Sequence, residues 1–224
     1  MLAEDLLLLY YDDDTGKPVL DSTKVDYSLA GAVLVELSMR GKVGVAGDGE
    51  RVRSGRLIVR DPEPTGDTVL DSALRVVRDK EGGKPKDVLG KLRKGLRESV
   101  LQRLADSGRL RRTDHRVLGL FPTPRWPVAD PGRKTHVRGR LREVLIDGHE
   151  PDESVVGLIA LLAAVDAVPK FVPSDDKRAT KRRAKEIAEG QWAGHAVRKA
   201  VQEVQAAVTG AVAAAGVAAS NGGG

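Results

Sequence analysis

Lysine and arginine side chains gather between residues 91 and 97 of this 224-residue chain. The cluster consists of Lys91, Arg93, Lys94 and Arg97. If this stretch is a single helix, Lys91, Lys94 and Arg97 recur every three residues and share one face. Arginine forks and lysine point charges on one ridge are suited to binding a phosphate group. The sequence therefore predicts an anion-binding surface here, and lipid headgroups and nucleic acids both carry such phosphates.

The basic cluster belongs to a longer positive region of the chain. Residues 84–142 contain 17 Lys or Arg against five Asp or Glu, although the formal charge of the whole chain is only +5. This asymmetry favours a positive face that meets an anionic partner, and the alternative is a solvated, salt-bridged helical surface. The region has neither the interleaved aromatic residues that stack on single strands nor a recognition-helix motif, so no nucleic acid is expected.

Residues that could perform catalysis are few. Asp12 and Asp14, one residue apart after an apolar run, resemble the paired aspartates of haloacid dehalogenase-like phosphatases. The Thr15-Gly16 pair that follows stands in the reverse of that motif's usual order, so an acidic turn is the favoured interpretation. The chain has no cysteine, and its four histidines lack the spacing of a metal site or of a catalytic triad. We expect a protein without enzymatic activity, metal site or cofactor.

Hydrophobic periodicity predicts the elements that must position the basic cluster. Helices are expected over residues 2–11, 26–40, 67–81, 87–107, 131–146 and 153–168 and from 175 onward. Asp67 can cap the third of these, and Gly41 is placed to stop the second. Short strands are expected over residues 42–45, 51–53 and 56–60, and residues 109–112 and 117–121 suggest a hairpin. Residues 153–168 are apolar nearly all round, so this helix should be the central buried one. We therefore expect a mainly α, single globular domain around a central apolar helix, with short β-strands and a protruding β-hairpin.

The composition divides the chain into two parts. Residues 1–205 form the predicted domain, and residues 206–224 are an Ala- and Gly-rich C-terminal tail. No stretch is identified with the roughly 20 apolar residues that cross a bilayer, and the start of the chain lacks the basic region of a signal peptide. These features favour a cytoplasmic protein that is soluble or that sits on a membrane surface.

The predicted hairpin carries scarce aromatic residues inside the basic region. Aromatic residues make up only 3% of the chain, and Phe121 and Trp126 lie here with Leu118 and Leu120. Exposed aromatic side chains beside arginines are suited to a bilayer interface or to a contact between protein molecules. The alternative is that the hairpin packs against its own core.

Three blocks occur in order along the chain: residues 29–41, residues 64–71 and the helix over residues 92–110. In this order and at these distances, they resemble the Golgi phosphoprotein 3 family, whose members are peripheral membrane proteins that bind phosphatidylinositol 4-phosphate. The resemblance covers residues 1–205 and implies the same mainly helical fold. The high content of Ala, Gly, Arg and Val suggests a bacterial member from a GC-rich genome.

The resemblance also implies roles for particular residues. Arg97 and Lys94 match two phosphate-binding arginines of the family. Lys94 lacks the bidentate guanidinium of an arginine, and the adjacent Arg93 could supply it instead. Ala30 and Asp21 occupy the positions of a further Arg and a Trp of the family's pocket, so the identity of the headgroup stays open. The family's hairpin mediates self-association, which implies a homo-oligomer through the same hairpin here.

Together these observations predict a cytoplasmic, peripherally membrane-associated module that binds anionic phospholipid. Lys91, Arg93, Lys94 and Arg97 would hold the headgroup, and Phe121 and Trp126 would assist at the interface. The alternative is an adapter or scaffold that uses the basic face and the hairpin to bind a client protein.

Overall fold

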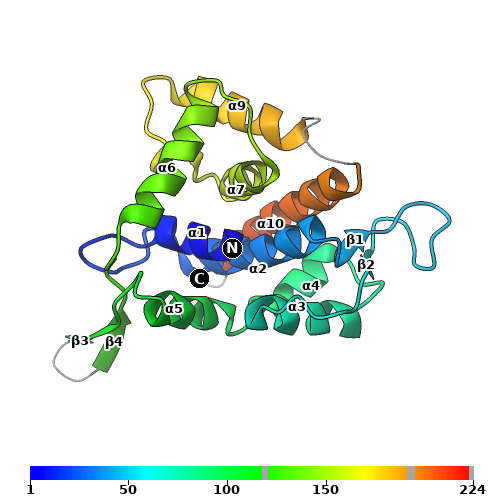
Figure 1. Cartoon of the computed structure of the whole chain (residues 1–224), viewed down its shortest axis with the longest axis horizontal. Coiled ribbons are helices and arrows are strands. Elements are labelled where there is room, and N and C mark those ends of the chain that lie inside the picture. Colours follow the sequence, from blue (N-terminus) through cyan, green and yellow to red (C-terminus); the bar gives the residue numbers. More distant parts are fainter. Residues whose placement is uncertain (118–120, 191–194, 222–224) are drawn as a thin grey trace.

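The computed structural model describes residues 1–117, 121–190 and 195–221, and the fold is the predicted mainly α single domain (Figure 1). The helices are α1 (Leu2–Tyr10), α2 (Ser22–Met39), α3 (Thr68–Asp79), α4 (Pro85–Leu92), α5 (Leu96–Asp106), α6 (Gly132–Leu145), α7 (Glu153–Ala164), α8 (Val168–Phe171), α9 (Lys177–Glu189) and α10 (His195–Asn221). The strands are β1 (Val43–Val45), β2 (Leu57–Val59), β3 (Thr113–Val117) and β4 (Phe121–Arg125).

Helices α2 and α7 together form the centre of the core. Nine of the twelve residues of α7 are buried, as its all-round apolar sequence predicts. However, α2 also lies at the centre, because it packs against α1, α3, α4, α5, α7 and α10. In Figure 1, α1 and α2 lie between an upper group with α6, α7 and α9 and a lower group with α3, α4 and α5. The lower group holds the predicted basic cluster.

Close packing around α2 depends on a glycine. A Cβ atom at Gly31 would lie 2.7 Å from Cδ2 of Leu161 in α7 and 2.9 Å from Cγ2 of Val208 in α10. Real Cβ atoms essentially never come this close to such groups, so the absence of a side chain lets both helices approach α2. The end of α2 follows the prediction, because Gly41 takes a left-handed conformation (φ +69°) immediately after the helix.

The start of α2 differs from the prediction. The helix begins at Ser22, one turn before the expected residue 26. Asp21 is its N-cap, and the Asp21 carboxylate accepts a hydrogen bond of 2.9 Å from the backbone N–H of Lys24. This extra turn brings Ser22 and Asp26 to the edge of the basic cluster, as described below.

The predicted helix over residues 87–107 is wrong, because it is two helices, α4 and α5, joined by residues 93–95. Gly95 adopts a left-handed conformation (φ +73°) directly before α5, which interrupts the regular helix. Lys94 therefore lies in the link, where its N–H donates to the carbonyl of Lys91 at 3.3 Å. Lys91, Lys94 and Arg97 consequently do not form one ridge on a continuous helix.

The two small sheets are antiparallel pairs. Strand β1 pairs with β2, with Gly44 opposite Ile58, and residues 51–53, predicted as a strand, form a loop between them. Strand β3 pairs with β4, with Thr113 opposite Arg125. The β3–β4 hairpin projects from the body, as Figure 1 shows, although its first strand begins at residue 113 rather than at residue 109.

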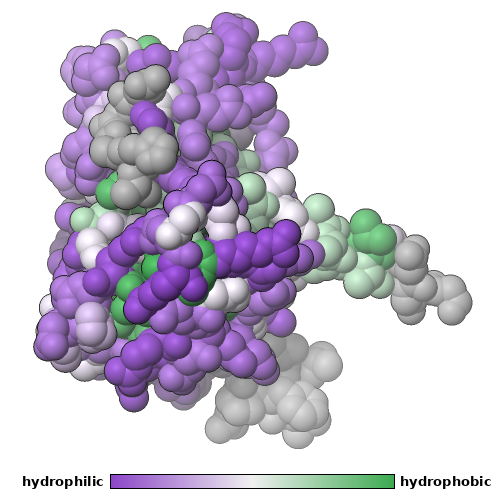
Figure 2. Space-filling model, turned by 90° about the vertical axis from the view of Figure 1, so that its right-hand side faces the viewer, coloured by the Kyte–Doolittle hydropathy of each residue, from purple (hydrophilic) through white to green (hydrophobic). Residues whose placement is uncertain are grey.

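Helix α10 crosses the predicted boundary at residue 205 without interruption. Val208 and Ala211 are buried against the body, whereas Val217 is 60% exposed. The second half of the helix extends outward as the pale arm in Figure 2. By length and composition, the segment from Val197 to Ser220 could cross a bilayer, so the expectation that no such stretch exists is wrong. Its first half packs against α2, α4 and α7, which is the behaviour of a core helix.

Candidate functional site

The block over residues 64–71 fixes α3 and ties it to α5. Both the N–H and the Oγ1 of Thr65 donate to Oδ1 of Asp71 at 2.6 Å. Asp67 caps α3 by accepting hydrogen bonds from the N–H groups of Val69 and Leu70 at 3.0 and 3.1 Å. The same carboxylate pairs with Arg103 of α5 at 2.6 Å. This block is therefore a structural junction that orients α5 and the link before it.

Hydrogen bonds and ion pairs at this junction stabilise the ionised forms of its side chains. Burial alone would raise the pKa of Asp67, but hydrogen bonds from Leu70 and Arg103 hold that pKa below its usual value. Arg103 also pairs with Glu4 of α1 at 2.7 Å. The junction thus joins α1, α3 and α5 through charge-assisted hydrogen bonds, which are stronger than neutral ones.

Arg97, at the start of α5, is held against the first turns of α2. Its Nε donates to Oδ1 of Asp26 at 2.7 Å, and its Nη2 donates to the carbonyl of Ser22 at 2.8 Å. The side chains of Arg97 and Asp26 remain 24% and 21% exposed. Burial raises the pKa of the neighbouring Tyr11 hydroxyl, and the positive charge of Arg97 opposes that shift. Arg97 is therefore a preorganised, partly exposed guanidinium.

Arg93 faces the same part of α2. Its guanidinium carbon lies 5.2 Å from the ring centroid of Tyr27, in cation–π geometry. Its Nε is buried and has no hydrogen-bond partner among the described residues. Arg93 and Arg97 thus form one pair of cations beside the first turns of α2.

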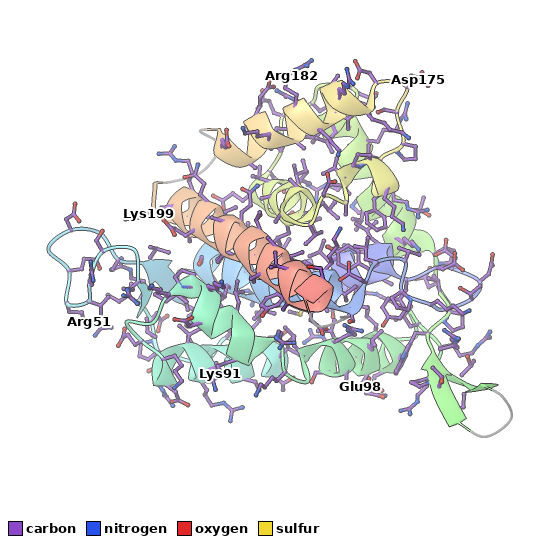
Figure 3. All side chains as sticks on the ribbon, turned by 180° about the vertical axis from the view of Figure 1, so that it is seen from behind. Arg51, Lys91, Glu98, Asp175, Arg182 and Lys199 are labelled. Carbon is purple, nitrogen blue, oxygen red and sulfur yellow. The ribbon has the colours of Figure 1, made fainter. Side chains whose placement is uncertain are left out.

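Lys91 and Lys94 lie on the other side of the link. Both are exposed, and both line a groove of about 370 Å³ between α3 and the α4–α5 link. Thr68, Ser72 and Ser99 add hydroxyl groups to this groove. Figure 3 labels Lys91 on α4 and Glu98 on α5 near the lower edge of the molecule. The structure therefore brings the four predicted residues to one link, but it divides them between two sides.

Ala30 and Asp21, which the resemblance implies stand at two pocket positions, both have structural roles here. Ala30 is fully buried within α2, so it offers only a methyl group to its neighbours. Asp21 serves as the N-cap of α2. The partners that do contact Arg97, Ser22 and Asp26, were missed by sequence reasoning. Asp26 stands 71 residues before Arg97, and the only local signal was a polar first turn on an otherwise apolar helix.

The hairpin base is anchored by Trp126, whose side chain is only 2% exposed. The N–H of Trp126 donates to the carbonyl of Gly16 at 3.0 Å, and Arg112 lies over its ring at 5.6 Å from the centroid. The expectation that Trp126 is an exposed membrane or oligomer contact is therefore wrong, because the ring packs against the body. Phe121 pairs with Val117 in the strand ladder. Leu118 and Leu120 lie outside the described residues.

The acidic turn uses its carboxylates internally. Asp12 accepts hydrogen bonds from the N–H and Oγ1 of Thr15 at 2.9 and 2.7 Å, and these bonds hold its pKa below the usual value. Asp13 pairs with the buried Lys134 of α6. Across residues 1–117, 121–190 and 195–221, no group of three or more His, Asp or Glu side chains is placed to hold a metal ion. The turn is explained by its own hydrogen bonds.

The protein is thus a helical domain with a cationic interhelix link and a projecting hairpin. The chain matches the model of the Golgi phosphoprotein 3 (GPP34) family over residues 2–204, and it belongs to that family, as its sequence blocks predict. It is similar to vacuolar protein sorting-associated protein 74 of Eremothecium gossypii, with 33% identity over 166 residues, which cover 65% of this chain and 49% of the relative.

The protein of the same name from Schizosaccharomyces pombe is 30% identical over 161 residues, which cover 64% of this chain and 48% of the relative. The chain thus spans about half the length of the curated relatives it matches.

Proposed function

We propose that this protein binds the headgroup of an anionic phospholipid at the α4–α5 link and is a peripheral membrane protein without enzymatic activity. The observation that carries the proposal is the placement of Arg97. Asp26 and Ser22 fix its guanidinium, yet about a quarter of the side chain stays exposed. A guanidinium held in one position loses little conformational freedom when its remaining N–H groups bind a phosphate.

Lys91 and Lys94 contribute through charge rather than through fixed geometry. Both side chains are exposed and make no ion pair within the described residues. Each basic residue near an anionic membrane surface contributes about 1 kcal/mol to attraction. Family membership supports the same role, and the proposal locates the protein on the cytoplasmic face of a membrane.

The finer proposal is that the preferred lipid is a phosphoinositide such as phosphatidylinositol 4-phosphate. The resemblance implies that Arg97 and Lys94 match two phosphate-binding arginines of the family, and this supports the choice of lipid. Ala30 supplies no charge, and the Asp26 carboxylate repels phosphate. The expected preference over other anionic lipids is therefore modest and depends mainly on Arg97.

Co-sedimentation with liposomes tests the proposal. Phosphatidylcholine vesicles are compared with vesicles that contain phosphatidylinositol, its 4-phosphate or phosphatidylserine at matched charge. The double variant Lys94→Ala/Arg97→Ala should lose binding to anionic vesicles and keep the helical circular dichroism spectrum. The matched control is Arg182→Ala/Lys185→Ala on α9, which removes two charges at the far end of the molecule (Figure 3). Equal binding by both double variants would contradict the assignment of the site.

The second candidate function is an adapter that binds a client protein or a second copy of the chain. The projecting β3–β4 hairpin is the observation that favours it, since such a ribbon offers edges and side chains for a protein contact (Figure 1). Light scattering after size exclusion should report an oligomer, and replacing residues 115–122 with a short Gly-Ser turn should yield a monomer. A monomeric parent protein would contradict self-association through the hairpin.

A further inference from the structure

A second cationic site lies at the opposite end of α4 from the proposed lipid site. The loop between β1 and β2, the start of α4 and the middle of α10 line an open cleft of about 430 Å³. Arg53 and Arg56 line it from the loop, Lys84 and Lys86 from the start of α4, and Glu203 from α10. Figure 3 shows these three elements together on one side of the molecule, around the labelled Arg51, Lys91 and Lys199.

The four cations of this cleft have no carboxylate partner within salt-bridge distance in the described part of the chain. Their neighbours differ in this respect. Arg51 pairs with Glu81 at 2.5 Å, and Arg60 pairs with Glu50 through hydrogen bonds of 2.5 and 2.8 Å. Hydrogen bonds from Arg60 and from the N–H of Gly47 lower the pKa of Glu50 to about 2. Glu50 and Glu81 are therefore committed elsewhere, and four cations face a single carboxylate, Glu203, in the cleft.

The start of α4 adds to this positive potential. Its N-cap is Lys84, whose ammonium group cannot accept the hydrogen bonds that a capping residue normally accepts, and no side chain caps the helix. The positive end of the helix dipole thus points toward a site that already holds two lysines and two arginines. The acidic residue of the first turn, Asp87, is exposed and does not line the cleft.

We propose that this cleft binds a small phosphorylated polyol, such as an inositol phosphate or a sugar phosphate. Arg53, Arg56, Lys84 and Lys86 supply the charge and the donors for a phosphate dianion. Glu203 opposes a bare phosphate ion, but its carboxylate accepts hydrogen bonds from ligand hydroxyl groups. A polyol that carries phosphate satisfies both kinds of group, and the cleft volume suits one molecule of that size.

This site is separate from the α4–α5 link. Residues 85 and 91 stand roughly 9 Å apart along the axis of α4 at 1.5 Å per residue. The proposal does not depend on lipid binding at the link, so either site can fail without the other. The Lys94→Ala/Arg97→Ala variant leaves the cleft unchanged and should keep its ligand.

Isothermal titration with soluble inositol 1,4-bisphosphate at low salt tests the proposal on the full chain that carries Lys94→Ala/Arg97→Ala. This variant serves as the parent here, because the same headgroup would otherwise also bind at the α4–α5 link. The variant Arg56→Gln/Lys86→Gln should bind about ten-fold or more weakly, because each change removes a charge-assisted contact to phosphate. The control is Arg51→Gln, which removes one charge from the same loop outside the cleft and should bind like the parent. Absence of binding by the parent, or equal loss in both variants, would overturn the proposal.

A third variant tests the choice of a polyol. Glu203→Gln should strengthen binding of inorganic phosphate and weaken the preference for inositol 1,4-bisphosphate over it. An unchanged preference would overturn the assignment of a phosphorylated polyol.

Vesicles with 5% phosphatidylinositol 4-phosphate then show whether the phosphorylated polyol in the cleft is a lipid headgroup or a soluble molecule. If Arg56→Gln/Lys86→Gln also reduces co-sedimentation, the cleft takes a membrane-bound headgroup, and if co-sedimentation is unchanged, the cleft takes a soluble one.

Discussion

Asp26 restrains the affinity of the proposed lipid site while it positions Arg97. Replacing it with asparagine, Asp26→Asn, retains a side-chain oxygen that accepts the 2.7 Å hydrogen bond from Nε of Arg97. The bond from Nη2 to the carbonyl of Ser22 also stays in place. Only the negative charge is lost, so Arg97 should remain near its present position. We expect this variant to bind anionic lipid more tightly than the parent.

The size of the effect follows from Coulomb's law. A phosphate on the outer side of the guanidinium would lie roughly 7 Å from the Asp26 carboxylate, which gives a repulsion of about 0.6 kcal/mol in water and about 2.4 kcal/mol at an effective dielectric constant of 20. The pair is partly exposed, so a value near 1 kcal/mol is reasonable, or about five-fold in affinity. Loss of the ion pair should lower the free energy of unfolding by about 0.5 kcal/mol.

The assay is co-sedimentation with vesicles of fixed anionic content at physiological salt. Asp175→Asn, near the start of α9 at the opposite end of the molecule, makes the same change in net charge (Figure 3). If the local repulsion is real, Asp26→Asn binds about five-fold more tightly than Asp175→Asn. Equal binding would refute the electrostatic reasoning, and weaker binding would show that the charge of Asp26 is needed to position Arg97.

Two further predictions concern the frame that holds the site. Gly31→Val should lower the free energy of unfolding by about 1–3 kcal/mol, because the new side chain overlaps α7 and α10. Urea denaturation measures this change. The control is Gly139→Val, because a Cβ atom at Gly139 has no other atom within 4 Å. Asp67→Asn should remove a stabilisation that is present above the unfolded pKa of about 3.9 and is lost as pH falls through the lower folded pKa. Stability curves of parent and variant should therefore converge in acid, and a constant gap down to pH 2 would contradict this origin.

Local sequence signals predict several of the helix starts and ends around the site. Asp67 as a cap and Gly41 as a helix stop are readable from the sequence, because each acts on its own neighbouring backbone. The break at Gly95 was missed because Leu92 and Leu96 keep the four-residue spacing of a buried stripe across it. Periodicity reports which residues are buried, and it does not report whether the backbone between them stays helical.

The contacts that define the site join residues that are distant in the sequence. The pairing of Arg97 with Asp26 joins residues 71 positions apart, and it depends on α2 starting one turn early. The burial of Trp126 likewise depends on its contact with the turn around Gly16, which is distant in sequence. Such contacts follow from the packing of whole helices, so a single sequence offers little information about them.

The outer part of α10 has a practical consequence for measuring how the protein sits on a surface. From Val212, the last partly buried residue packed against the core, to Asn221 the helix extends roughly 14 Å at 1.5 Å per residue. Because the inner half is fixed by α2, α4 and α7, this segment moves with the body. A spin label or fluorophore at Val217 would therefore act as a pointer, and its distance to a bilayer would report the orientation of the whole domain.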